Sequence, residues 1–293
     1  MLTLGILCSG RLGLNTLSKI AKEYAIEFIL TDSNSFGIID FATNNHIPFF
    51  TGNPRKGNGY SFVRNFSVDV IASINYLFLI EKDIIEHSNS LTFNIHGSLS
   101  PKYRGRTPHV WAIINGETKA GITAHIIDSG CDTGQIIHQL EMPIETEDTG
   151  AIMLDKYANA YYPLVKKVLY NLVHNQLNLI VQNEKHATYF GKRTAEDGEI
   201  NWQWTKESIR NWVRAQANPY PGAFTFYKNQ KVIIDKVSFS NERTTKNQVN
   251  GEIIKIEPKV TVKTQNGSVS LDVIRTENCT FVIGNKFCNE NRK

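Results

Sequence analysis

The 293-residue sequence lacks several features that would assign it to particular classes of protein. No apolar stretch reaches the roughly 18 residues that a transmembrane helix requires, so we expect no membrane span. The chain starts with a short apolar run but no basic leader, so we expect no signal peptide and a cytoplasmic location. The four cysteines include no Cys-x-x-C pair, which argues against a zinc site or a redox motif and favours reduced thiols.

Two phosphate-binding motifs are also missing. The turn after the first apolar run reads Ser9-Gly10-Arg11-Leu12-Gly13. It has neither the Gly-x-Gly-x-x-Gly spacing of dinucleotide sites nor the Gly-Lys-Ser/Thr of a P-loop, so we expect no nicotinamide cofactor. The histidines and carboxylates show no metal-ligand spacing, so no metal is predicted. The net charge of +4 is mild and does not by itself indicate a nucleic-acid partner.

The length and the 41% hydrophobic content exceed what most single cores hold, which predicts two domains. In the first part of the chain, short apolar runs alternate with helical patterns. This alternation predicts a doubly wound, mostly parallel α/β sheet with helices on both faces. Beyond Pro221, short alternating runs predict a small β-barrel-like domain. We expect the α/β domain to cover 1–195 and the β-rich domain 200–285.

The apolar periodicities also predict individual elements. Strands of the α/β domain are expected at 2–8, 26–31, 47–50, 68–74, 91–95, 121–128 and 135–141. Helices are expected at about 14–24, 38–45, 150–175 (kinked at Pro163) and 205–217. Residues 52–60 are predicted to be a loop and 188–201 a linker, and residues after 284 are expected to fray. Strands of the β-rich domain are expected at 223–228, 231–238, 251–256, 259–264 and 268–274.

Three polar residues suggest a site for acyl transfer. Asn94 and His96 end a predicted strand two residues apart, so their side chains share a face, and ligands of parallel sheets gather at such strand ends. Asp132 follows a later strand in a glycine-flanked turn. An amide can stabilise an oxyanion, and a histidine held by a carboxylate can take a proton from an attacking amine. By spacing alone, a structural histidine and a turn-forming aspartate remain an alternative.

The stretch Phe93–Gly134 resembles the 10-formyltetrahydrofolate-dependent formyltransferase family. The family's Asn-x-His is matched by Asn94-Ile95-His96. Its Ser-Leu-Leu-Pro-x-x-Arg-Gly loop is matched by residues 98–105, with Ser100 in place of the second leucine. Its catalytic aspartate before Thr-Gly is matched by Asp132. Residues 197–227 are similar to the family's link into its small β-domain.

The resemblance implies a Rossmann-like catalytic domain, an OB-like C-terminal domain and an N-formyltransferase activity. It implies that 10-formyltetrahydrofolate is the co-substrate. It also implies that His96, held by Asp132, acts as the base, while Asn94 polarises the formyl carbonyl. The folate is expected to bind, largely through backbone groups, beside Leu77, Phe78, Leu79 and Ile80.

The identity of the formyl acceptor rests on two features. The family's methionyl-tRNA enzymes carry a long basic loop after their second strand, whereas residues 31–37 here are few and include no Lys or Arg. A loop without cations would lose the phosphate contacts that dominate nucleic-acid affinity, so we expect no nucleic-acid partner. The run from Tyr103 to Glu117 is more similar to nucleotide-sugar formyltransferases.

The resemblance therefore favours the amine of a nucleotide-linked amino-deoxysugar as acceptor, with dTDP-4-amino-4,6-dideoxyglucose as the expected compound. Such products belong to bacterial surface polysaccharides, including the lipopolysaccharide O-antigen. A homodimer through the C-terminal domain is implied by the family alone. A methionyl-tRNA formyltransferase and a non-catalytic nucleotide-sugar or folate-binding protein are the alternatives.

Several residues are candidates to bind the substrate's diphosphate and sugar. Arg11 lies in a glycine-containing turn, where backbone N–H groups favour anions. The other candidates are in the loop after Asn-x-His: Ser98, Lys102, Tyr103, Arg104 and Arg106. Each cation is equally compatible with a solvated surface charge. His125 and His138 lie on predicted strands and are expected to be structural.

Five aromatic residues lie near the predicted start of the β-rich domain. They are Trp202, Trp204, Trp212, Tyr220 and Phe224. Aromatic rings can stack on a nucleotide base, but at this density they more often form a seam between domains. Both interpretations are open from the sequence.

Overall fold

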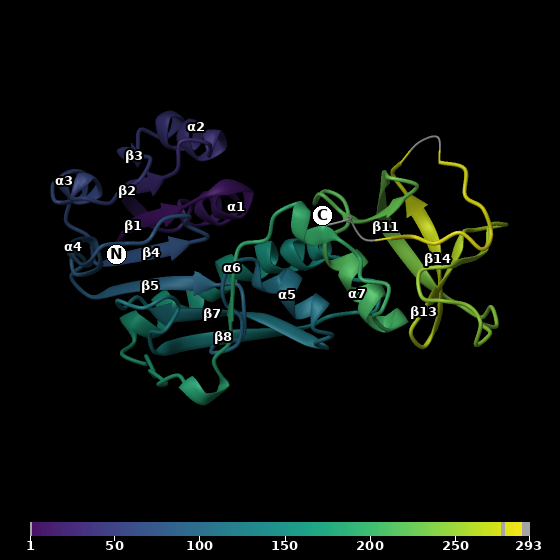
Figure 1. Cartoon of the computed structure of the whole chain (residues 1–293). Helices are drawn as coiled ribbons and strands as arrows, with labels where there is room; N and C mark the ends of the chain where they lie inside the picture. Colours follow the sequence, from purple (N-terminus) through teal and green to yellow (C-terminus); the bar gives the residue numbers. More distant parts are fainter. Residues whose placement is uncertain (1, 277–278, 289–293) are drawn as a thin grey trace. The chain divides into compact units, whose positions relative to one another are not determined.

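The computed structural model describes residues 2–276 and 279–288, and its chain divides into two compact units (Figure 1). The first unit contains the chain up to Gly105 together with Gly121–Met142 and Lys156–Phe190. The second unit contains the remaining segments. The predicted domain division between residues 195 and 200 stays a prediction.

The first unit is built on a seven-stranded sheet with the order β3-β2-β1-β4-β5-β7-β8. Its strands are β1 (Thr3–Cys8), β2 (Ala25–Thr31), β3 (Phe49–Thr51), β4 (Val70–Ile74), β5 (Leu91–His96), β7 (Lys119–Ile126) and β8 (Ile136–Pro143). The pairs from β3 to β5 are parallel, and β5 pairs antiparallel with β7. The structure confirms the predicted doubly wound, mostly parallel sheet.

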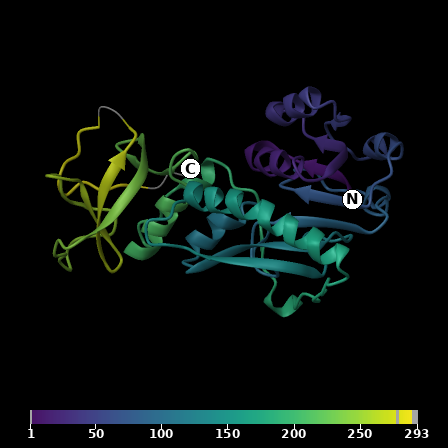
Figure 2. The same ribbon diagram turned by 180° about the vertical axis from the view of Figure 1, so that it is seen from behind.

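Helices connect these strands. They are α1 (Gly10–Ile20), α2 (Phe36–Asn44), α3 (Asn58–Val63), α4 (Lys82–Ile85), α5 (Pro108–Ile114) and α6 (Gly150–Val173). Of these, α5 and the start of α6, up to Asp155, belong to the second unit. Figure 2 shows α6 as a long helix lying along the sheet, and it continues through Pro163. Helix α3 begins at Asn58, inside the segment 52–60 that was predicted to be a loop, so this prediction was wrong for residues 58–60. Gly57, at a φ of 75°, permits the tight turn into this helix.

The central strands of the first unit are buried on both faces, which explains their continuous apolar runs. All five residues of β4 are buried, as are Phe93 and Ile95 of β5. Gly5 of β1 leaves room for the ring of Phe28, since a Cβ at this position would lie 2.2 Å from that ring. Close packing of this kind gives the strand ends fixed positions.

The second unit contains a curled five-stranded antiparallel sheet with the order β10-β11-β14-β13-β12. Its elements are α7 (Lys206–Ala215), β10 (Ala223–Tyr227), β11 (Gln230–Ser240), β12 (Ile253–Lys255), β13 (Thr261–Thr264) and β14 (Gly267–Ile274). Trp202 is buried in the core of this unit, with Trp204 and Trp212 packed against it. This sheet confirms the predicted β-rich C-terminal fold.

Two expectations about irregular segments were wrong. Phe287 is fully buried and Cys288 pairs with Phe226 of β10, so residues 285–288 do not fray. The packing of one aromatic ring into the core outweighs the polar composition around it. The rest of that expectation, at 289–293, lies outside the described residues. The predicted linker at 188–201 also contains β9 (Tyr189–Phe190), which pairs with β6 (Arg104–Gly105) in the first unit.

Within the part of the chain that the structure describes, no helix combines the length and the apolar character needed to cross a membrane.

Candidate active site

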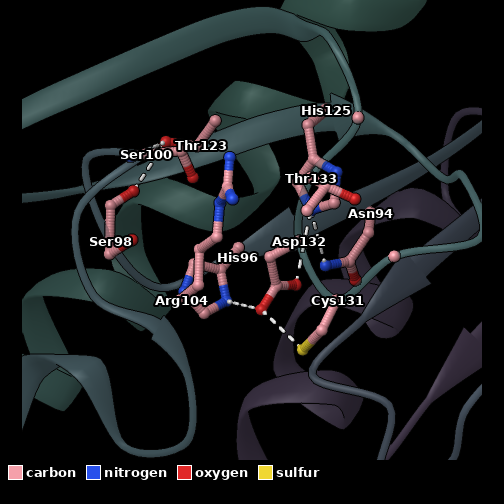
Figure 3. Close-up of polar contacts among 12 residues, drawn as sticks. Asn94, His96, Ser98, Ser100, Arg104, Thr123, His125, Cys131, Asp132 and Thr133 are labelled. Carbon is pink, nitrogen blue, oxygen red and sulfur yellow. Dashed lines mark hydrogen bonds and ion pairs between the residues drawn. The ribbon is translucent and has the colours of Figure 1, made fainter. Parts of the chain in front are cut away.

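Four polar side chains meet in the first unit where β5 ends (Figure 3). Asn94 and His96 lie on β5, and the antiparallel register places His125 of β7 directly opposite Asn94. Asp132 lies in the turn between β7 and β8. The structure therefore brings together the three residues that were predicted to be catalytic, along with a fourth residue that was not.

Asp132 is the point at which these contacts converge. Its Oδ2 lies 3.4 Å from His96 Nδ1, and its Oδ1 lies 3.6 Å from His125 Nε2. The backbone N–H of Gly105 donates to Oδ2 over 3.0 Å. Burial alone would raise the pKa of this carboxyl. The electrostatic interaction with His96, the contact with His125 and the hydrogen bond from the Gly105 N–H outweigh burial and hold the pKa of Asp132 well below its usual range. Asp132 is therefore ionised at neutral pH.

His96 has different surroundings at its two ring nitrogens. Its Nε2 lies 2.8 Å from the carbonyl oxygen of Tyr103, which can only accept, so Nε2 carries the proton. In the neutral ring, Nδ1 is then the bare nitrogen, and it faces Asp132. Burial lowers the pKa of His96, although Asp132 and the Tyr103 carbonyl oppose this effect. His96 is thus neutral at pH 7 and can take up a proton at Nδ1.

His125 fixes the orientation of the Asn94 amide. The Nδ1 of His125 lies 2.8 Å from the carbonyl oxygen of Ile126, so this nitrogen carries the ring's proton. The Nε2 atom is then an acceptor, and it receives an N–H from Asn94 Nδ2 over 3.1 Å. An amide nitrogen has two hydrogens, and this bond uses one of them.

The expectation that His125 is merely a structural strand residue missed these contacts. His125 is buried and touches both Asn94 and Asp132. Only the antiparallel pairing of β5 with β7 places the two residues together. His138, on β8, is partly buried and lies outside the group of four.

The residues predicted to bind the substrate divide into two groups. Arg11 and Lys102 are exposed. Ser98 is buried, and its hydroxyl donates to the backbone carbonyl of Lys102 over 2.6 Å. Tyr103 is also mostly buried and stacks on Phe190 with ring centroids 5.1 Å apart. Ser98 and Tyr103 thus shape the loop between β5 and β6.

Arg104 is fully enclosed, in contrast to the substrate-facing cation that the sequence suggested. Its guanidinium donates to Gln182, Glu184 and Tyr189. The ion pair with Glu184 measures 2.7 Å. These contacts compensate the cost of burying a cation and assign Arg104 to the support of the loop. Arg106 is exposed and begins a segment of the second unit.

The residues predicted to bind folate follow β4. Leu77 is 46% exposed and Leu79 is 65% exposed, which is high for large apolar side chains. Phe78 contacts Tyr76 edge to face, and Ile80 packs against the core beneath β4. This segment therefore presents apolar surface near the end of a central strand.

Among residues 2–276 and 279–288, no group of three or more His, Cys, Asp or Glu side chains could hold a metal ion.

Comparisons with known proteins agree with this arrangement. Residues 36–169 match the Formyl transferase family, and residues 192–292 match the family Formyl transferase, C-terminal domain. The structure is similar to WlaRD, a sugar 3N-formyl transferase, with a TM-score of 0.74, 24% identity, and 92% and 97% of the two chains covered. It is similar to the N-formyltransferase of Helicobacter canadensis, with a TM-score of 0.74, 25% identity, and coverage of 92% and 99%.

A methionyl-tRNA formyltransferase from Clostridium thermocellum is also similar, with a TM-score of 0.56, 21% identity, and coverage of 83% and 96%. The two family models together span most of the chain and confirm the resemblance seen in Phe93–Gly134. The chain belongs to the formyl transferase family.

Proposed function

We propose that this protein transfers the formyl group of 10-formyltetrahydrofolate to the amine of a dTDP-linked amino-deoxysugar. The convergence of Asn94, His96 and Asp132 is the main support for the reaction. The Helicobacter canadensis enzyme, whose structure contains folinic acid and dTDP-3-aminofucose, supports the class of donor and acceptor.

Each of the three residues has a chemical role in this proposal. The bound folate supplies an activated one-carbon acyl group. The second N–H of Asn94, directed by the bond to His125, polarises the formyl oxygen and stabilises the negative charge that develops on it. His96 takes up the proton of the attacking amine at Nδ1, and Asp132 stabilises the resulting imidazolium. The bond between the formyl carbon and N10 of the folate then breaks, and His96 returns the proton to N10, so that tetrahydrofolate leaves.

The proposed folate site also fits this chain. The exposed apolar side chains of Leu77 and Leu79 offer surface that a flat pterin ring would cover. Leu77 and Leu79 would hold the ring, and Asn94 would meet the formyl group. Among the exposed cations of the first unit, Arg11 and Lys102 are our candidates for the diphosphate.

The segment after β2 favours a sugar acceptor over tRNA. β2 ends at Thr31 and α2 begins at Phe36, so only Asp32, Ser33, Asn34 and Ser35 connect them. This connection has no cation to contact a phosphate backbone. The alternative of a non-catalytic binding protein has less support, because mere binding does not require an amide, an imidazole and a carboxylate at one point.

A formyl-transfer assay tests the proposal. Purified protein is incubated with 10-formyltetrahydrofolate and, separately, dTDP-4-amino-4,6-dideoxyglucose, its 3-amino counterpart, UDP- and GDP-linked amino sugars, and initiator methionyl-tRNA. Release of tetrahydrofolate and the mass of the product report transfer. We expect the dTDP-4-amino sugar to be the preferred acceptor. Preference for the 3-amino sugar would correct the position of the amine, and transfer to tRNA alone would overturn the sugar proposal.

The homodimer and the role in surface polysaccharide synthesis are proposals that rest on family resemblance, and the cytoplasmic location stays a proposal.

A further inference from the structure

Gln182, on the segment that follows α6, uses every hydrogen-bonding position of its side chain. The side-chain nitrogen donates to the backbone carbonyl of Asp132 over 2.9 Å and to that of Gly134 over 2.7 Å. The side-chain oxygen accepts from Nε of Arg104 over 3.2 Å and from Nη2 over 2.7 Å. A carboxamide has two N–H groups and two lone pairs, so its capacity is filled. The residue is only 6% exposed.

The turn that Gln182 contacts has an unfavourable backbone conformation. Asp132 has a φ of 58°, in the left-handed region that residues other than glycine seldom adopt. Gly134 packs so closely that a Cβ there would lie 1.9 Å from the carbonyl oxygen of Ile126. The two bonds from Gln182 fix the peptide groups on either side of the Thr133–Gly134 pair. They therefore oppose relaxation of Asp132 toward a more common conformation, which would turn its carboxylate away from His96.

The same amide also holds the loop on the other side of Asp132. The side-chain oxygen of Gln182 accepts a hydrogen bond from the guanidinium of Arg104, the residue before Gly105. Gly105 donates its N–H to the Asp132 carboxylate. Gly105 has a φ of 98°, and a Cβ there would lie 2.4 Å from the carbonyl oxygen of Phe190. Gln182 thus links the backbone of Asp132 to β6, the strand whose residue Gly105 donates an N–H to the Asp132 carboxylate.

We infer that Gln182 is a positioning residue for formyl transfer, which sets the geometry between Asp132 and His96 without touching the substrate. The inference rests on the proposed function. Gln182 lies outside the sequence motifs of the site, 50 residues after Asp132 along the chain.

Two substitutions separate positioning from simple structural support. Gln182→Glu keeps the oxygen that Arg104 binds but removes both N–H donors to the turn, whereas Gln182→Ala removes every bond. Gln176→Ala is the matched control, because Gln176 is exposed. We expect kcat to fall about 10- to 100-fold in both Gln182 variants, since small misplacements of reacting groups have such effects. We expect the KM of each substrate to change less than about threefold, because Gln182 is not in the binding surface.

A second measurement does not depend on activity. Cys131 is exposed and directly precedes Asp132, so its rate of alkylation by iodoacetamide reports the geometry of the turn. Peptide mass spectrometry distinguishes Cys131 from Cys288, the exposed thiol of the second unit that serves as the internal reference. We expect the rate at Cys131 to change at least threefold in both Gln182 variants and the rate at Cys288 to stay constant.

The outcomes are distinct. If the wild type transfers formyl and Gln182→Glu retains the kcat of Gln176→Ala, the inference is overturned. It is also overturned if the loss of kcat only matches a loss of folded protein in a thermal unfolding experiment. A wild type that transfers formyl to no acceptor overturns the proposed function instead. In that case, an unchanged alkylation rate at Cys131 overturns the claim that Gln182 fixes the turn, and a changed rate supports it.

Discussion

Replacement of Asp132 by asparagine tests the electrostatic part of the site directly. The substitution preserves the shape of the side chain but removes its charge, 3.4 Å from His96 Nδ1. At an effective dielectric constant of about 20, two unit charges at this separation interact by about 5 kcal/mol. The amide dipole replaces a part of this, so about 3–4 kcal/mol of stabilisation of the protonated His96 is lost. We expect kcat/KM to fall by about 10²- to 10³-fold.

The dependence of kcat/KM on pH provides a second readout of the same substitution. The charge of Asp132 raises the pKa of His96, against the larger effect of burial. Without that charge, the pKa of His96 falls further. The acid limb of the kcat/KM profile should therefore move to lower pH in Asp132→Asn, even though its plateau is lower.

Asp128→Asn is the matched control, because it makes the same chemical change in the same turn. Asp128 is exposed and accepts from the Thr133 hydroxyl and the Gly130 N–H, bonds that an asparagine oxygen can also accept. Circular dichroism and thermal unfolding establish that both variants are folded. If Asp132→Asn retains kcat/KM within about threefold of Asp128→Asn, the proposed role of the carboxylate is wrong.

Three further predictions concern the wild-type protein and substitutions at two other residues. In the wild type, kcat/KM should be constant near pH 7 and decline only below pH 6.5, because the pKa of neutral His96 is lowered from 6.5 by burial; a limb above pH 7 would contradict this. Burial lowers the pKa of His109 to about 4, so protons bind preferentially to the unfolded chain as the pH falls from 6.5 to 4. The free energy of unfolding of the wild type should therefore fall by about 3 kcal/mol more over this pH range than that of His109→Phe, as measured by urea unfolding. The same dependence on pH in both proteins would refute this prediction. Gly105→Ala should lower the free energy of unfolding by about 1–3 kcal/mol, because the new methyl group meets the Phe190 carbonyl at a positive φ; unaltered urea stability would contradict this.

The sheet was predictable from the sequence because strands that are buried on both faces consist of apolar residues. Strands such as β4 are buried throughout and therefore appear as uninterrupted apolar runs. Asn94, His96 and Asp132 were also predictable, because each lies at a strand end or in a glycine-flanked turn and because the surrounding motifs resemble a known family. In the structure, His96 is in contact with Asp132, and Asn94 is linked to Asp132 through His125.

The supports of the site were not predictable in the same way. Gln182 lies in a segment without periodicity, and its partners are 48 to 78 residues away along the chain. Arginine side chains are normally exposed, and the burial of Arg104 is explained by its ion pair with Glu184. The role of His125 depends on the register of two strands. Each of these features arises from pairing between distant segments, which local sequence patterns do not record.

The antiparallel register of β5 and β7 has a consequence for folding as well as for chemistry. Asn94 lies opposite His125, and His96 lies opposite Thr123. A slip of two residues would keep every side chain on its own face of the sheet, yet it would place Thr123 or Ile127 opposite Asn94. The alternation of inward and outward side chains therefore does not discriminate between these pairings, whereas the Asn94–His125 hydrogen bond exists in only one of them. The polar pair that orients the amide thus also selects the pairing on which the site depends.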